Sequence, residues 1–194
     1  MKKYLGKFLL LLTICTLPVF LLSCLIPEKF DVKIIINKDK TFSFVYDGIL
    51  TFVLARGAAV EGSLSAKDEK ELQAMGDQEL KRDKNFKKFK YLGKGRYEVF
   101  YKKEGELKRK ESFFDFIHII PLKENKVEIR SIKLSKDDIM QFEALKMKID
   151  GTVEVKTDGN ILEQNGKKSF WGSGYKWRIK SVKDPAPYML IQAR

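Results

Sequence analysis

Cys24 is the residue whose type and position point most directly to chemistry. It follows an apolar run that begins at Phe8, behind a short head that carries three lysines. A basic head, a short hydrophobic middle and a small residue before the break, here Ser23, are typical of a secretory signal. The thiol directly after the break would lie at the membrane surface, where a lipid donor can reach it.

Leu21, Ser23 and Cys24 resemble the bacterial lipobox at its positions −3, −1 and +1. This resemblance implies that the thiol of Cys24 receives a diacylglycerol, that the leader is cut after Ser23, and that the new amine is acylated. One acyl chain holds a protein to a bilayer only marginally, at about 0.8 kcal/mol per buried methylene, whereas several chains anchor it stably. Residues 1–23 would then be a signal peptide.

An uncleaved signal anchor is the alternative. The run from Phe8 to Ile26 approaches the length of about 20 apolar residues that spans a bilayer. Pro18 interrupts this run, and Cys24 lies where processing would need it, so we favour cleavage. The other cysteine, Cys15, follows Ile14, which is a poor residue at −1, and we assign it to the hydrophobic region.

The rest of the sequence predicts neither an enzyme nor a metal or cofactor site. It lacks the glycine-rich phosphate loop, the Gly-x-Ser-x-Gly elbow and the His-Glu-x-x-His and Cys-x-x-Cys motifs. His118 is the only histidine, and a zinc site takes three or four protein ligands. Asp137 and Asp138 lie in the first turn of a predicted helix, where acids are ordinary stabilisers.

Composition indicates a folded, basic domain. The formal charge of +12 becomes +9 once the leader, with three lysines and no acids, is removed, and 171 of the 194 residues remain. Such an excess favours anionic head groups or nucleic acid. An exported protein seldom meets nucleic acid, so we expect none as a partner; a lysine-rich surface without a specific partner is the simplest interpretation. With Cys24 lipidated, no disulfide can form.

Two segments are predicted to be helices, near 66–82 and 136–146. Ser65 and Ser135 can cap their first turns, and acids follow each serine. Residues 49–55 fit either a strand or a buried helix. Their β-branched and aromatic content favours a bent continuation of the preceding strand with Gly48 at a bulge, followed by a glycine-rich loop.

Alternating apolar residues predict strands over most of the remaining chain. The predicted strands lie near 30–36, 41–46, 83–90, 96–102, 113–120, 127–134, 149–156, 175–179 and 188–192. Asp158-Gly159 suits a tight hairpin. The fold class predicted is therefore α+β, a mainly antiparallel sheet of about eight to ten strands with two helices packed on it. We expect residues 24–29 to form a lipidated tether and residues 30–194 a single domain.

Three segments carry a resemblance to a known family. They are Val32-Lys33-Ile34 with Asn37-Lys38-Asp39, Asp150–Val153 with Thr157–Gly159, and Tyr175-Lys176-Trp177. Together they resemble the LppM-type domain of bacterial lipoproteins. The resemblance implies a mixed α/β domain with a shallow apolar pocket that binds lipids.

The sequence thus predicts a non-enzymatic lipoprotein of the cell envelope that binds a lipid or another amphiphile. Aromatic residues on the sheet would face the ligand: Phe42, Phe44, Tyr97, Tyr101, Tyr175 and Trp177. The alternative is a structural or assembly lipoprotein that docks an envelope protein through an edge strand or the first helix. Leu25 stands where an aspartate would favour retention at the inner membrane, so the resemblance implies the outer membrane in a two-membrane host and otherwise the outer face of the cell membrane.

Overall fold

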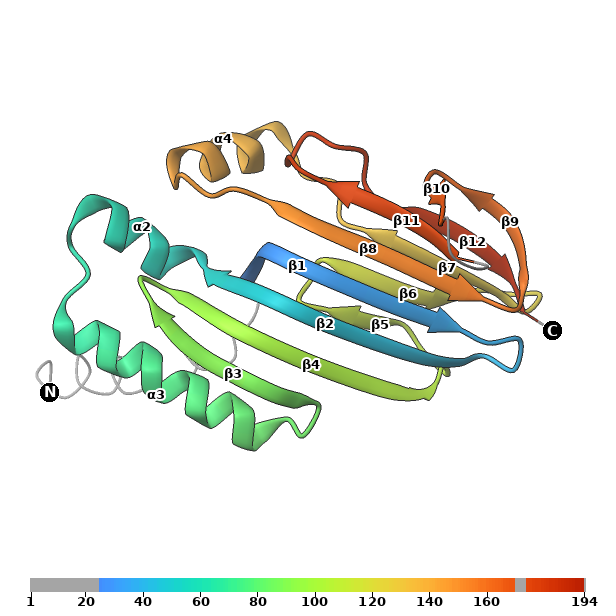
Figure 1. Ribbon diagram of the computed structural model, residues 1–194, viewed down its shortest axis with the longest axis horizontal. Helices are drawn as coiled ribbons and strands as arrows, with labels where there is room; N and C mark the ends of the chain where they lie inside the picture. Colours follow the sequence, from blue (N-terminus) through green and yellow to red (C-terminus); the bar gives the residue numbers. More distant parts are fainter. Residues whose placement is uncertain (1–24, 170–173, 194) are drawn as a thin grey trace, which may run out of the picture.

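Two β-sheets and three helices make up the part of the chain that the computed structural model describes, residues 25–169 and 174–193 (Figure 1). The larger sheet has seven strands in the order β10-β11-β8-β1-β2-β4-β3. Its strands are β1 (Leu25–Ile36), β2 (Thr41–Phe52), β3 (Phe86–Gly93), β4 (Arg96–Glu106), β8 (Asp150–Thr157), β10 (Lys167–Lys168) and β11 (Gly174–Ile179).

The smaller sheet has five strands in the order β5-β6-β7-β12-β9. Its strands are β5 (Glu111–Phe113), β6 (Ile117–Pro121), β7 (Lys126–Ser131), β9 (Asn160–Gln164) and β12 (Tyr188–Gln192). The helices are α2 (Val53–Glu61), α3 (Ala66–Arg82) and α4 (Lys136–Ala144). None of these three helices is long and apolar enough to cross a bilayer.

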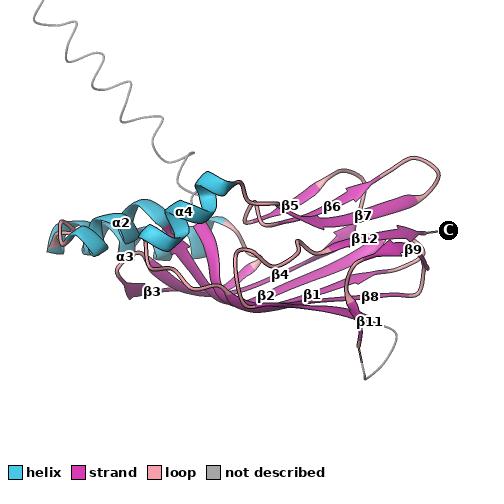
Figure 2. Ribbon diagram, turned by 90° about the horizontal axis from the view of Figure 1, so that it is seen from above, coloured by secondary structure: helices cyan, strands magenta, loops and turns pink. Residues whose placement is uncertain are grey.

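The smaller sheet and α3 cover the same face of the larger sheet (Figure 2). The ring of Phe30 on β1 meets the ring of Phe116, beside β6, edge-on at 5.1 Å between centroids. On β4, Tyr101 lies 6.2 Å from Phe113 of the smaller sheet, while Tyr97 donates a hydrogen bond to the carbonyl of Leu72 on α3. The core is therefore one layer of apolar side chains between the larger sheet and these two covers.

The opposite face of the larger sheet meets water, and some of its charges are paired. Lys88 and Glu98 form an ion pair across β3 and β4, and Arg178 pairs with Asp150 across β11 and β8. Exposed pairs of this kind contribute little to stability, typically less than about 1 kcal/mol. They show how a basic sequence covers a sheet with interleaved charges of both signs.

The α+β class predicted from the sequence is confirmed at the coarse level, with differences in detail. The described strands number twelve, in two sheets rather than one, and there are three helices rather than two. One pairing is parallel: β1 runs alongside β8, with Val32 opposite Val153. The period-two patterns predicted the strands themselves, but such a pattern carries no information on which strands pair.

Both predicted helices are present, and their caps explain where they begin. Ser65 accepts a hydrogen bond from the N–H of Asp68, whose carboxylate accepts one from the N–H of Ser65. Ser135 and Asp138 repeat this reciprocal arrangement at the start of α4. Each capping box satisfies two backbone N–H groups that would otherwise have no partner at a helix start.

The segment after Gly48 differs from the prediction. The strand continues only to Phe52, and residues predicted as strand and loop form α2, which ends at Gly62 with a φ of 75°. The bulge lies on the partner strand, where the register shifts between Pro27 and Lys29. Gly48 instead allows the backbones of β1 and β2 to approach closely, because a Cβ at this position would lie 2.1 Å from the carbonyl oxygen of Lys29.

Two predicted connections are also corrected. The segment predicted as one strand, 113–120, is the β5–β6 hairpin, which turns at Phe114 to Phe116. The Asp158-Gly159 turn does not join two paired strands, because β8 belongs to the larger sheet and β9 to the smaller. It carries the chain from one sheet to the other.

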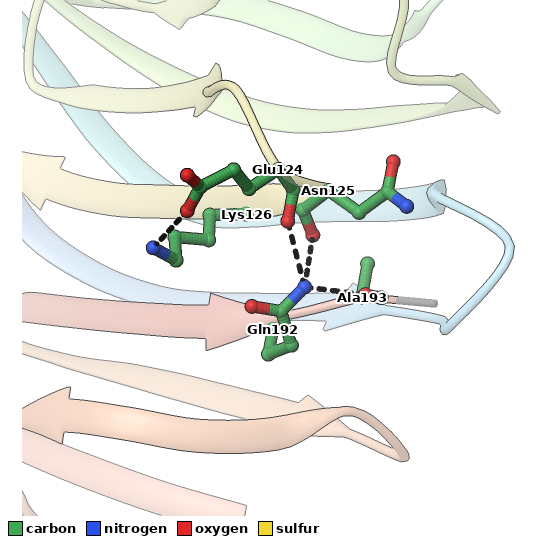
Figure 3. Close-up of polar contacts among 5 residues, drawn as sticks. All are labelled: Glu124, Asn125, Lys126, Gln192 and Ala193. Atoms are coloured by element: carbon green, nitrogen blue, oxygen red, sulfur yellow. Dashed lines mark hydrogen bonds and ion pairs between the residues drawn. The ribbon is translucent and has the colours of Figure 1, made fainter.

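The ends of the described chain are fixed in the sheets. β1 begins at Leu25, so residues 25–29, predicted as a tether, are part of a strand. At the other end, the side-chain amide of Gln192 donates to the carbonyls of Glu124 at 2.7 Å and Asn125 at 3.4 Å (Figure 3). These bonds tie β12 to the turn between β6 and β7.

Candidate functional site

A groove of about 800 Å³ lies beside α4, at the end of the fold where β1 begins. We call it the α4 groove. Five parts of the chain, far apart in the sequence, form its walls, and most of the side chains they contribute are apolar. They are residues 25–27 at the start of β1, Val53 at the start of α2, residues 114–116 between β5 and β6, residues from 131–149 between the end of β7 and the start of β8, and residues 179–187 between β11 and β12.

The apolar face of α4 forms one wall. Ile139, Phe142 and Leu145 recur every three residues and therefore share a face of the helix. All three line the α4 groove, and the side chain of Phe142 is 5% exposed. The sequence predicted a helix packed on the sheet, but the apolar face of this helix is divided between packing and the wall of the groove.

The β5–β6 turn forms a second wall and is strained. Phe114 and Asp115 have φ angles of 53° and 48°, and the N–H of Phe116 donates to the carbonyl of Phe113 at 3.0 Å. Positive φ is rare for a bulky residue. A backbone conformation of this kind costs on the order of 1–3 kcal/mol per residue and persists only where the surrounding structure enforces it. Here the ring of Phe114 packs edge-on against Tyr46 at 4.9 Å, which holds the turn in place.

The β11–β12 loop closes the third side. The carboxylate of Asp184 accepts hydrogen bonds from the N–H groups of Lys180 at 2.7 Å and Ser181 at 2.9 Å. The carbonyl of Pro187 accepts one from the N–H of Ser131 at the end of β7. These bonds give polar backbone groups of the loop their partners. The side chain of Val182, within this loop, lines the groove.

Charged groups that line the groove are mostly engaged in structural contacts. Asp138 belongs to the α4 capping box, and hydrogen bonds from the hydroxyl and N–H of Ser135 lower the pKa of its carboxyl. Lys183 forms an exposed ion pair with Glu143 at 3.0 Å. Lys133 is exposed at the rim. Apolar walls with charges at the rim suit a ligand that has an apolar body and a polar end.

The aromatic residues predicted to face a ligand lie elsewhere. Five of them are core residues, at most 8% exposed, and Tyr175 is partly buried against the same core; none of the six lines the α4 groove. The rings of Phe44 and Phe113 stack at 3.7 Å between centroids. The indole of Trp177 donates to Asn165 at 2.7 Å. The aromatic face of the larger sheet is thus filled by the second sheet and α3.

Tyr97 shows how one of these residues is used instead. Its hydroxyl is buried and donates to the carbonyl of Leu72 on α3 at 3.0 Å, and burial raises the pKa of that hydroxyl. The packing of α3 on β3 and β4 also fixes this helix to the sheet, with Leu72 buried and Leu80 39% exposed.

The two residues of the predicted cleavage and lipidation site, Ser23 and Cys24, lie outside the described residues. Leu25, the next residue in the chain, lines the α4 groove and is 3% exposed. Sequence reasoning missed the groove because its walls come from distant segments. The only local signal was the shared face of Ile139, Phe142 and Leu145.

The single histidine has a structural environment. His118 on β6 lies with its Nδ1 2.9 Å from the hydroxyl of Ser112 on β5. Burial, together with the nearby charges of Lys110 and Arg130, lowers the pKa of His118. Among residues 25–169 and 174–193, no cluster of three or more His, Cys, Asp or Glu side chains could hold a metal ion.

Comparison with known proteins returned two solved structures. The NMR structure of the folded domain of LppM from Mycobacterium tuberculosis is 14% identical, with a TM-score of 0.42, and the match covers 88% of this chain and 90% of that domain. Native yeast LTA4 hydrolase is 10% identical, with a TM-score of 0.36, over 87% of this chain and 29% of the hydrolase. No family model and no curated protein matches the sequence. Both structural likenesses are faint and concern the fold alone.

Proposed function

We propose that the chain is a membrane-anchored lipoprotein of the cell envelope, whose folded domain is a non-enzymatic module that holds a lipid or another amphiphile in the α4 groove. The observation that carries this proposal is the groove itself, about 800 Å³ with mostly apolar walls. Pockets that bind small ligands typically have about 300–1,000 Å³ and mostly apolar linings with a few polar groups. One or two acyl chains of a lipid would suit a pocket of this size and lining.

The position of the groove supports the membrane anchor. The start of β1, with Leu25, Ile26 and Pro27, forms one wall, and Cys24 directly precedes it in the sequence. If Cys24 is lipidated, the mouth of the groove lies close to the bilayer from which a lipid would come.

The charges around the groove favour binding over catalysis. The carboxylates of Asp138 and Asp184 accept hydrogen bonds from backbone N–H groups of their own turns. A carboxylate fixed by backbone hydrogen bonds of its own turn has a structural role, and this does not favour its use as a general acid or base.

The ligand is tested by native mass spectrometry of the full chain, extracted from bacterial membranes under mild conditions. We expect a bound lipid on the wild-type protein. Ala186→Trp, which adds an indole to the wall of the groove, should abolish it; the control Ala74→Trp, at an exposed position on α3, should not. A wild-type protein that carries no lipid and takes up no fluorescent fatty acid contradicts the proposal, as does full binding by Ala186→Trp.

The anchor is tested separately on the same preparation. The intact mass of the mature chain should begin at Cys24 and include the acyl chains, and labelled palmitate should enter the wild-type protein but not Cys24→Ala. The lipoprotein assignment is contradicted if the wild-type protein does not incorporate labelled palmitate. It is also contradicted if the Cys24→Ala form is cleaved and stays on membranes.

A further inference from the structure

The residue after Cys24 is already part of the folded core. Leu25 is 3% exposed and lies opposite Phe52 in the β1–β2 pair, and Ile26 lies opposite Thr51. Consecutive Cα atoms are about 3.8 Å apart. A lipid on Cys24 would therefore be joined to the sheet without any flexible spacer, and the end of the fold at which β1 begins would be held against the bilayer.

That end of the fold exposes large apolar side chains around the α4 groove. Leu54 on α2 is 65% exposed, Met140 on α4 is 59% exposed, and Ile132 is 44% exposed. Ile132 lines the groove, while Leu54 and Met140 are chain neighbours of the lining residues Val53 and Ile139. We call these three side chains the groove-end patch.

The helices that carry Leu54 and Met140 approach each other at one point. A Cβ on Gly57 of α2 would lie 3.5 Å from the side chain of Leu145, which follows α4, so the two helices approach closely. Figure 1 shows α2 and α4 at the same end of the molecule as the first residues of β1. Single exposed apolar residues are ordinary, but several around one groove mark an interaction surface.

Four exposed lysines lie in the sequence before and after the centre of α4. Lys133 and Lys136 precede the centre of the helix, Lys146 and Lys148 follow it, and all four are exposed. Near an anionic membrane, each well-placed lysine contributes about 1 kcal/mol of attraction. The acids between these lysines are Asp137, which is exposed, Asp138, which is used in the capping box, and Glu143, which pairs with Lys183.

We propose that the groove-end patch lies on the lipid bilayer that holds the acyl chains of Cys24, so that the α4 groove opens toward the membrane and receives its lipid directly from it. This inference rests on the proposed lipoprotein function and adds an orientation to it. The occupant of the patch is the lipid surface, because the chain directly before Leu25 leads to the anchor and the lysines beside the patch match anionic head groups.

The mature chain allows a direct test, because it has no cysteine other than Cys24. Leu54→Cys and Met140→Cys each place a thiol in the patch, and Leu162→Cys is the control, at a 47% exposed position on β9. The lipidated full-length products would be labelled with an environment-sensitive fluorophore and reconstituted into phosphatidylethanolamine and phosphatidylglycerol vesicles. Some vesicles would also contain spin-labelled lipid as a quencher.

We expect the probes at 54 and 140 to emit at shorter wavelength than the probe at 162, and spin-labelled lipid to quench them at least about twofold more. Equal water exposure of all three probes on attached protein overturns the orientation. A blue shift that lipid does not quench also overturns it, because it indicates a contact with protein, such as a second copy.

Native mass spectra of the same samples report the bound lipid independently of the probes. A lipid in the groove together with water-exposed probes at 54 and 140 would leave the proposed function intact and reject only the orientation. A product without acyl mass would reject both, since the anchor is the premise of the orientation.

Discussion

The rings of Phe44 and Phe113 stack face to face, with 3.7 Å between centroids and 5° between planes, and join the two sheets. Phe44 comes from β2 of the larger sheet and Phe113 from β5 of the smaller one. The sequence predicted that Phe44 faces a ligand, yet its side chain is 1% exposed and is covered by protein.

Phe44→Ala is therefore expected to act on stability. Removing a buried phenylalanine typically costs about 3–5 kcal/mol, because apolar contacts are lost and a cavity remains. Urea unfolding should show this loss, whereas Leu162→Ala, at a 47% exposed position, should stay within about 0.5 kcal/mol of the wild type. A small effect of Phe44→Ala would mean that the two sheets do not pack as described.

Asp115→Gly should stabilise the protein. Asp115 is exposed and has a φ of 48°, a left-handed conformation that costs an L-residue roughly 1–2 kcal/mol and glycine almost nothing. The gain in the free energy of unfolding should be about 1 kcal/mol after the greater freedom of glycine in the unfolded chain is subtracted. Asp47→Gly, in the middle of β2, is the control and should destabilise by about 0.5–1 kcal/mol.

The two capping boxes provide a matched pair of variants. Ser135→Ala and Ser65→Ala should each cost about 1 kcal/mol in urea unfolding, because each removes the side chain that caps a helix. Of the two capped helices, α4 lines the α4 groove and α3 does not, so only Ser135→Ala should also weaken lipid retention in native mass spectra. Equal retention by the two variants would argue against α4 as a wall of the binding site.

His118 should make stability depend on pH. Its pKa is lowered from 6.5 in the folded protein, first by burial and then by Lys110 and Arg130. As the pH falls through about 6.5, the unfolded chain takes up the proton first, so this contribution to stability is present above that pH and is lost below it. Between pH 7 and pH 5, His118→Gln should lose less stability than the wild type in urea titrations. Parallel curves would show that the histidine is not desolvated.

Local patterns predicted much of the fold. Alternation in β1 placed Val32, Ile34 and Ile36 on the buried face, and serine followed by aspartate located the starts of α3 and α4. These features depend on side chains within a few residues of one another, so a single segment contains the whole signal.

The remaining features depend on contacts between distant segments. No glycine marks the turn at Phe114-Asp115, which tertiary packing against Tyr46 enforces. The aromatic face was predicted as a cleft because the sequence does not show that a second sheet covers it. The α4 groove exists only where five separate parts of the chain meet, and no single stretch contains that information.

The position of β1 has a consequence for the order in which the chain can assemble. β1 lies between β2, which follows it directly, and β8, where Asp31 reaches Thr152, 121 positions later. A parallel pairing over such a separation closes slowly, because the entropy of a long loop is lost before the contacts form. β1 is therefore paired on one side only until the chain as far as Thr157, the last residue of β8, is available.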